Sequence, residues 1–379
     1  MIKLLFTASR ASHIMQFHQP YIDYYLQHGV QVYTAAQGQV EIPNVVHKNI
    51  VFEKQNLIKN LKSILELRKF IKTESIDIVI SNATLAGIMT RAAVFMLLKK
   101  PKVIHSCHGY LFSKSSSALK KFVYICIEKI FSPVTSLVLT MNQEDFAYAQ
   151  KYKFAKKIIN IPGIGYVPKF ENLKKTEQNS KQMELCRNFI TGENVYTIVY
   201  AAELSVRKNQ TQLVDLLYPL LCKHQNWRLI LAGDGILKEE LAEKIKALNI
   251  ENKILLPGFI SNIYELLSAA DVVVSTSKSE GLPFNIMDAM TLGVPVLASD
   301  VKGHSDLITS GKNGFLFSLN EPSDFANKLE TLETDKALRQ TFVENAKTTM
   351  NNFLIETVQK QVLNAYSEAD SRLKFWNNK

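Results

Sequence analysis

Short apolar runs alternate with longer amphipathic segments along most of the chain. In the longer segments, apolar residues recur at the three- and four-residue spacing of one helix face. Buried strands joined by helices form parallel sheets with right-handed crossovers, so the pattern predicts a doubly wound α/β fold. The expected strands cover residues 3–8, 30–34, 76–81, 102–107, 136–139, 158–161, 197–201, 227–232, 254–256 and 272–275. The expected helices include residues 14–28, 55–72, 85–98, 119–131, 210–221, 236–248, 284–292, 336–353 and 356–375.

The pattern is interrupted between residues 165 and 192, where Lys, Glu, Asn and Gln dominate and the apolar periodicity is lost. A chain of 379 residues is long enough for two domains of ordinary size. We therefore expect two Rossmann-like domains, residues 1–170 and 190–355, with ligands bound at the carboxyl ends of their strands. A cleft between the domains would then hold the substrates.

Composition excludes several classes of protein. The chain has no run of 18 apolar residues, so no transmembrane helix is expected, and its first apolar run is too short for a signal peptide. We therefore expect a cytoplasmic protein. The four cysteines are widely spaced and form no C-x-x-C pair, which argues against a zinc or disulfide framework.

The net charge of +10 is unevenly distributed. Residues 1–190 hold 26 Lys and Arg against 12 Asp and Glu, a net charge of +14, whereas residues 191–379 have a net charge of −4. Two basic amphipathic patterns, residues 55–72 and 119–131, are typical of helices that lie on an anionic membrane or hold polyphosphate groups. An ordinary solvated lysine face is the alternative. No nucleic-acid-binding module accompanies the charge, so nucleic acid is not an expected partner.

The most informative stretch covers residues 277–306, where a buried strand leads into a glycine turn and a short helix. Glu280 lies just before this helix and Asp288 just over one turn into it, so both carboxylates can line one cleft. Free amide groups at a helix N-terminus favour a phosphate, and carboxylates accept hydrogen bonds from hydroxyl groups. A nucleotide-sugar combines both kinds of group. The turn residues expected to approach such a donor are Gly281, Leu282 and Pro283.

Other donor-site candidates also follow buried strands. Arg207 and Lys208 stand in a loop where two cations can neutralise a pyrophosphate as a glycosidic bond breaks. Gly233 opens a Gly-Asp-Gly turn, which is typical of a tight turn or of a phosphate loop. Gly258 and Phe259 follow a strand end where a nucleotide base could pack, although Phe259 could equally belong to the core.

The first half of the chain supplies a second group of candidates. His108 comes directly after a buried strand, where it can hydrogen-bond a sugar hydroxyl or move a proton. Ser9, His13 and His18 occupy the first strand-to-helix region and are candidates for acceptor contact. His13 and His18 are five positions apart, which is not a metal-ligand spacing, and no third ligand is evident, so no metal is expected. His105, inside the strand, is expected to be structural.

Several of these motifs resemble one known family. SEGLPFNIMDAM, with the following VKGHSDLITSGKNGFLF, is similar to the E-x7-E region and glycine loop of the family 4 retaining glycosyltransferases, which have the two-domain GT-B fold. HIMQFHQPY, HGYLF, MNQEDFAYAQ and IPGIGYVPKF resemble the bacterial subgroup that builds capsular polysaccharide, exopolysaccharide and O-antigen. The resemblance also implies that the C-terminal helix, within residues 356–379, crosses back to the first domain.

The resemblance assigns roles to the candidates. It implies that Glu280 and His108 contact the transferred sugar, that Asp288 binds the ribose, and that Arg207 and Lys208 hold the donor pyrophosphate. The chain has no D-x-D motif. No metal is therefore expected at the pyrophosphate, and no other cofactor is implied.

The expected activity is transfer of a hexose or N-acetylhexosamine from a nucleotide-diphospho sugar, most simply a UDP-sugar, with retention. The acceptor implied by the resemblance is an undecaprenyl-pyrophosphate-linked saccharide at the inner face of the plasma membrane, and we expect peripheral association with that anionic surface. Asp23, Glu144 and Asp145 are the candidate bases of the first domain, but each is typical of a helix face. This favours a mechanism in which the departing phosphate helps to deprotonate the acceptor.

Two positions depart from the family pattern. Asp288 replaces a glutamate, and Glu203 stands where an arginine is common. Two alternatives therefore remain open: a nucleotide-sugar epimerase of the same fold, and a non-catalytic relative that binds a sugar or lipid.

Overall fold

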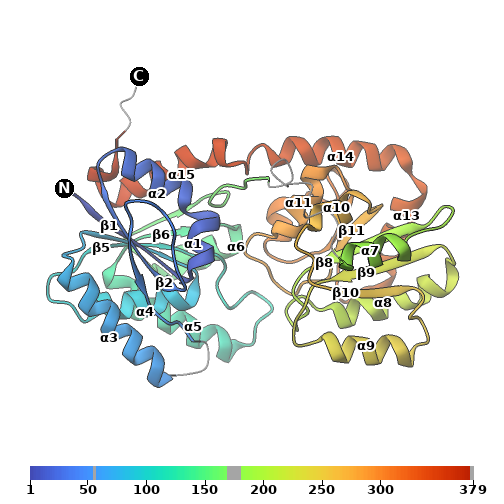
Figure 1. The fold of residues 1–379 in the computed structure, drawn as a ribbon, viewed down its shortest axis with the longest axis horizontal. Coiled ribbons are helices and arrows are strands. Elements are labelled where there is room, and N and C mark those ends of the chain that lie inside the picture. Colours follow the sequence, from blue (N-terminus) through green and yellow to red (C-terminus); the bar gives the residue numbers. More distant parts are fainter. Residues whose placement is uncertain (54–56, 169–180, 376–379) are drawn as a thin grey trace. The chain divides into compact units, whose positions relative to one another are not determined.

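The computed structural model describes residues 1–53, 57–168 and 181–375, and the chain divides into two compact units (Figure 1). The first unit comprises Met1–Tyr166 with Phe353–Lys379, and the second comprises Val167–Asn352. Residues 55–56 of the expected helix 55–72, residues 169–180 of the interruption between the domains and residues 376–379 of the C-terminal segment lie outside the described residues. Each unit is built on one parallel sheet with helices between its strands, which confirms the expected fold class.

The first unit has a seven-stranded sheet in the order β3-β2-β1-β4-β5-β6-β7. All six neighbouring pairs are parallel. Its strands are β1 (Lys3–Arg10), β2 (Gln31–Gln37), β3 (Val46–Asn49), β4 (Ile78–Asn82), β5 (Lys102–Ser106), β6 (Thr135–Thr140) and β7 (Lys157–Asn160). Its helices are α1 (Ala11–Phe17), α2 (Gln19–Gln27), α3 (Leu57–Thr73), α4 (Thr84–Phe95), α5 (Ala118–Phe131), α6 (Gln143–Tyr152) and α15 (Ile355–Ala369).

The second unit has a six-stranded parallel sheet in the order β10-β9-β8-β11-β12-β13. Its strands are β8 (Tyr196–Ala201), β9 (Trp227–Ala232), β10 (Ile254–Gly258), β11 (Val272–Ser275), β12 (Val296–Ser299) and β13 (Phe315–Phe317). Its helices are α7 (Lys181–Phe189), α8 (Gln210–Lys223), α9 (Lys238–Ala247), α10 (Ile263–Ser268), α11 (Phe284–Leu292), α12 (His304–Leu307), α13 (Pro322–Thr334) and α14 (Lys336–Met350).

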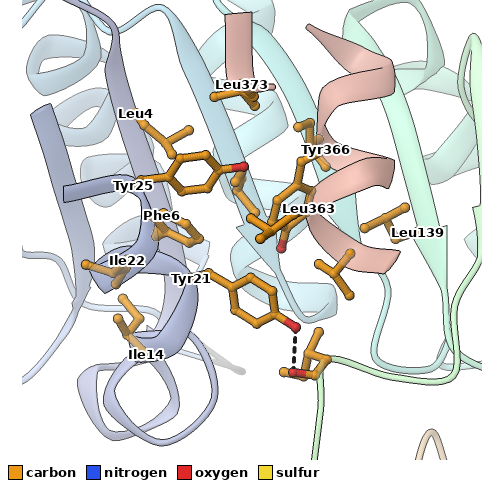
Figure 2. Close-up of a cluster of buried hydrophobic side chains, with 14 of the residues drawn as sticks. Leu4, Phe6, Ile14, Tyr21, Ile22, Tyr25, Leu139, Leu363, Tyr366 and Leu373 are labelled. Atoms are coloured by element: carbon orange, nitrogen blue, oxygen red, sulfur yellow. Dashed lines mark hydrogen bonds between the residues drawn. The ribbon is translucent and has the colours of Figure 1, made fainter. Parts of the chain in front are cut away.

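The C-terminal helix α15 packs on the first unit (Figure 2). Its buried Leu363 and Tyr366 lie among side chains of α2 and of the sheet, including Tyr21 and Leu139. The chain enters this helix through two backbone hydrogen bonds of Tyr166, one accepted by the carbonyl oxygen of Phe353 at 2.7 Å and one donated by the amide of Ile355 at 3.0 Å. The first core is therefore completed by the last helix of the chain.

One expected helix, residues 14–28, is wrong. The structure has two helices there, α1 and α2, which meet at His18. Pro20 lies in the first turn of α2, where its fixed φ and missing amide hydrogen suit a helix start but not a helix interior. The break buries His18 completely.

Among the helices of the described ranges, none is long and apolar enough to cross a lipid bilayer.

Candidate active site

The strand order of the second sheet reverses direction between β8 and β11. β8 pairs with β9 on one side and with β11 on the other. In doubly wound sheets, the crevice at such a switch point lies at the carboxyl ends of the strands. The loop after β8 carries Arg207 and Lys208, and the loop after β11 carries Glu280. The topology therefore brings these three residues to one edge of the sheet.

Glu280 forms ion pairs with both cations. Its Oε1 lies 2.6 Å from Nζ of Lys208, and its Oε2 lies 2.7 Å from Nη1 of Arg207. Glu280 and Lys208 are buried, with exposed fractions of 7% and 9%, whereas Arg207 is exposed. Arg207 also donates to the carbonyl oxygen of Ser279 at 3.2 Å. Charged hydrogen bonds thus tie the two loops together.

This cluster keeps an excess of positive charge. Burial alone would raise the pKa of Glu280, but Lys208 and Arg207 outweigh it and lower the pKa to about 2. Burial lowers the pKa of Lys208, and attraction to Glu280 only partly offsets this effect. One carboxylate balances two cations, so an anionic ligand such as a phosphate would stabilise the buried ammonium further.

Buried hydroxyl groups fix the loop that carries the two cations. The hydroxyl of Tyr200 donates to the carbonyl oxygen of Lys208 at 3.0 Å and lies 2.8 Å from Oγ of Ser277. Oγ1 of Thr276 donates to the carbonyl oxygens of Lys208 and Asn209, at 3.2 and 3.0 Å. Sequence reasoning missed these supporting residues, although the Ser-Thr-Ser run directly after an apolar strand is a visible signal.

Gly303 allows a close approach behind Glu280. A Cβ atom built on Gly303 would lie 2.7 Å from Cβ of Glu280 and 2.9 Å from its backbone carbon and oxygen. Gly303 also has a φ of +86°, which side chains rarely adopt. The amide of Glu280 donates to the carbonyl oxygen of Lys302, the residue before Gly303, at 3.1 Å. The second glycine loop therefore sets the position of the carboxylate.

A cavity of about 430 Å³ opens beside this cluster, within the second unit. Asp288 and Phe259 line it, and Phe259 is 68% exposed rather than part of the core. Asn285, which sequence reasoning missed, also lines it, and both polar atoms of its side chain are buried without a hydrogen-bond partner in the described part of the chain. The lining residues are Ala201, Ala202, Glu203, Ala232, Gly233, Asp234, Phe259, Ile260, Ser261, Ile263, Leu267, Asn285 and Asp288.

The expected donor residues fall into two groups. Gly233, Phe259 and Asp288 line the cavity, and the carbonyl oxygen of Gly258 accepts a hydrogen bond from the amide of Gly233 at 2.9 Å. Gly233 must be a glycine, because a Cβ there would lie 2.0 Å from the carbonyl oxygen of Ala202. Glu280 and the turn residues Gly281, Leu282 and Pro283 lie outside this lining. Asp288 and Glu280 therefore face different parts of the site.

In the first unit, the structure gathers three predicted histidines. His13 lies on α1, His18 at the break between α1 and α2, and His108 directly after β5. One ring nitrogen from each lies within 4.8 Å of the others. The expectation that His13 and His18 have no third partner is therefore wrong, since His108 supplies one from a distant part of the chain. Ser9 lies near the end of β1 and is half-buried.

Two of the candidate bases hold the loop that contains His108. The carboxylate of Asp145 accepts a hydrogen bond from the amide of Tyr110 at 3.0 Å and is fully buried. Glu144 accepts one from the amide of Lys114 at 2.7 Å. These contacts give both carboxylates a structural role at the start of α6. His105 is buried in β5, with Nδ1 3.1 Å from Oγ of Ser81, as expected of a structural residue.

Comparison with known proteins shows relatives along the whole chain. EpsD of Bacillus subtilis (strain 168), which is named as a glycosyltransferase, is 31% identical over 98% of this chain and 99% of its own length. The UDP-Gal:alpha-D-GlcNAc-diphosphoundecaprenol alpha-1,3-galactosyltransferase of Escherichia coli is 29% identical over 75% of this chain and 73% of its own. The crystal structure of Anabaena HepE in complex with UDP and glucose shares the fold, with a TM-score of 0.75 and 20% identity over 97% of this chain and 100% of that one.

The profile of the family described as Glycosyl transferases group 1 matches residues 187–349. This segment contains the cation pair, Glu280 and the cavity. The two parallel sheets match the GT-B architecture of glycosyltransferase structures. The chain therefore belongs to the group 1 glycosyl transferases.

Proposed function

We propose that this glycosyltransferase moves a hexose or N-acetylhexosamine from a nucleotide-diphospho sugar to a lipid-linked saccharide, with retention of the anomeric configuration. The observation that carries the proposal is the Arg207–Glu280–Lys208 cluster at the switch point of the second sheet. Its net positive charge suits a donor pyrophosphate, and the ionised Glu280 can accept hydrogen bonds from sugar hydroxyls.

The cavity beside the cluster would hold the nucleoside. Phe259 offers an exposed ring against which a base can pack, and Asp288 offers a carboxylate for the ribose hydroxyls. Asn285 adds an amide whose donor and acceptor groups have no protein partner in the described ranges. We propose UDP as the nucleotide, because the Escherichia coli relative is named for UDP-Gal and HepE was crystallised with UDP.

In the proposed mechanism, the two cations act on the leaving group. As the bond between sugar and phosphate breaks, negative charge grows on the phosphate, and Lys208 and Arg207 stabilise that charge. Asp145 and Glu144 accept hydrogen bonds from the loop that contains His108, so neither carboxylate is assigned as the base. The departing phosphate itself takes the proton of the acceptor hydroxyl. No metal is assigned to the donor pyrophosphate, since its charge is met by the two cations.

The exposed face of helix α5 supports the proposal that the acceptor is lipid-linked and is met at a membrane surface. Leu119, Phe122, Val123 and Ile130 are exposed and fall on one stripe of this helix at 100° per residue. The opposite side carries the buried Glu128.

Glu128 explains why the helix presents its apolar stripe outward. Both of its carboxylate oxygens bind the buried Arg91 of α4, at 2.6 and 2.9 Å, so the charged side of α5 packs inward. The exposed Lys120 and Lys129 flank the apolar stripe. Apolar residues between lysines can enter an anionic leaflet. We therefore propose peripheral association with the inner face of the plasma membrane, where an undecaprenyl-pyrophosphate-linked acceptor would be met.

Donor binding is tested by thermal unfolding of the purified protein with UDP, GDP and ADP and their sugars. We expect one nucleotide series, the UDP series, to raise the melting temperature as its concentration rises, because a ligand that binds only the folded state stabilises it. If no nucleotide raises it, the donor site is assigned wrongly. Incubating the protein with the stabilising nucleotide-sugar and no acceptor then separates transfer from epimerisation, because an epimerase would convert the nucleotide-sugar without an acceptor.

A further inference from the structure

The three histidines of the first unit form a compact cluster from separate parts of the chain. The ring centroid of His13 lies 4.9 Å from that of His108 and 5.2 Å from that of His18, and the centroids of His18 and His108 are 6.1 Å apart. Among the described residues, this is the group whose His, Cys, Asp or Glu ligand atoms come close enough to hold a metal ion. It contains three imidazoles and no carboxylate.

The nitrogens of this cluster lack protein partners. Nδ1 of His13, both ring nitrogens of His18 and Nε2 of His108 are buried and accept or donate no hydrogen bond within residues 1–53, 57–168 and 181–375. His18 has no exposed surface at all. Buried polar atoms without partners are costly and uncommon in folded proteins. Four such atoms on three neighbouring imidazoles, with one ring nitrogen of each within 4.8 Å of the others, indicate a missing ligand.

We propose that His13, His18 and His108 bind one divalent transition-metal ion, for which Zn²⁺ is the best fit. Three neutral nitrogen ligands suit Zn²⁺ or Co²⁺, whereas Mg²⁺ and Ca²⁺ require oxygen ligands. In a tetrahedral zinc site with bonds of about 2.0–2.1 Å, the nitrogens are about 3.3 Å apart. Small rotations of the three side chains would close the present separation of up to 4.8 Å.

The geometry also predicts an open site. His13 and His108 are only partly buried, so atoms of these two residues other than the nitrogens named above reach solvent. A fourth position would be free for water or for a hydroxyl or phosphate oxygen of a substrate, as in zinc sites with three protein ligands. All three ligands belong to the first unit.

The affinity should be moderate. Histidines in tight zinc sites usually donate their second ring nitrogen to a carboxylate or carbonyl group, and losing such a partner weakens binding by about 10- to 100-fold. Both ring nitrogens of His18 are without such a partner in the described structure. We therefore expect an ion that a chelator removes and that returns when the metal is added back.

Metal binding is measured directly on the full chain after treatment with a chelator. We expect equilibrium dialysis to show one bound Zn²⁺ per chain, and Co²⁺ to give the visible absorption of a four-coordinate site. His13→Gln and His108→Gln should each weaken binding at least 10-fold and remove the Co²⁺ absorption. His28→Gln, which changes an exposed histidine of the same unit, should leave both unchanged.

The inference would be overturned by two results. One is that the chelated wild-type protein binds no Zn²⁺ or Co²⁺ at millimolar concentration. The other is that the double variant His13→Gln, His108→Gln, shown to be folded by circular dichroism, binds Zn²⁺ with unchanged affinity. Because neither measurement uses a sugar donor, a failure here is distinct from a failure of the proposed transferase activity.

Discussion

The ammonium group of Lys208 lies 2.6 Å from Oε1 of Glu280, although 72 positions separate the two residues along the chain. The contact joins the loop after β8 to the loop after β11, across the switch point of the second sheet. Both side chains are buried, so removing Glu280 would leave the ammonium group of Lys208 buried without its counter-ion. This pair is the centre of the proposed donor site.

Lys208→Met should lower kcat/KM for sugar transfer by about 10²–10³-fold, because it removes a preorganised cation from the leaving phosphate. The measurement is steady-state transfer with a saturating acceptor. Lys223→Met is a matched control, since Lys223 forms an exposed ion pair with Glu330 in the same unit. Equal losses in the two variants would show that Lys208 has no special part in the reaction.

Glu280→Gln should change how stability depends on pH. The pKa of Glu280 is lowered from 4.5 to about 2, so its ionised form stabilises the folded state above about pH 4.5 by about 3 kcal/mol. This contribution is lost as the pH falls from about 4.5 to about 2. Urea unfolding at several pH values should therefore show a difference between wild type and variant that is largest at neutral pH and shrinks in acid. Parallel curves would contradict the ion-pair description.

Gly303→Ala should displace Glu280 and reduce transfer at least 10-fold. The new methyl group would meet Cβ of Glu280 at 2.7 Å, and the φ of +86° adds backbone strain of about 1 kcal/mol. Gly311→Ala separates these effects, because Gly311 has a φ of +79° with no atom within 4 Å of the added Cβ. We expect Gly311→Ala to lose stability and to keep its specific activity. A comparable loss of activity in both variants would mean that strain alone is responsible.

Phe122→Glu should weaken binding to anionic lipid vesicles, because the charge would enter the apolar stripe of α5. Flotation or sedimentation with vesicles that contain phosphatidylglycerol measures the bound fraction. Ile236→Glu is the control, since Ile236 is 82% exposed and lies in the second unit. If both substitutions reduce vesicle binding equally, α5 is not the membrane-contacting element.

Much of this fold follows from local patterns in the chain. Continuous apolar runs mark the central strands of both sheets, and the turn around Glu280 marks the start of α11. Strand order then brings Arg207 and Lys208 to Glu280, because all three follow neighbouring strands at the switch point. Residues of that kind can be found from a single sequence, since the topology of parallel sheets restricts where their loops meet.

Other features depend on contacts that no local pattern reveals. His108 meets His13 and His18 only because β5 and α1 are brought to the same edge of the first sheet, and the spacing of the two early histidines gives no sign of it. Asn285 resembles any polar residue in the first turn of a helix until its side chain is seen to lack partners. The helix break at His18 was readable from Pro20, but the apolar periodicity through residues 14–28 hides it.

The most direct test of the proposed function follows a radiolabelled sugar from its UDP donor into the lipid fraction. The purified protein is mixed with a panel of UDP-sugars and an undecaprenyl-pyrophosphate-linked saccharide, and the product is extracted and its new linkage is examined by NMR. We expect label in the lipid fraction only when donor and acceptor are both present, with the anomeric configuration of the donor retained. Inversion would contradict the retaining mechanism. A wild-type protein that binds a UDP-sugar but labels no acceptor, or that epimerises the donor alone, would contradict the account as a whole.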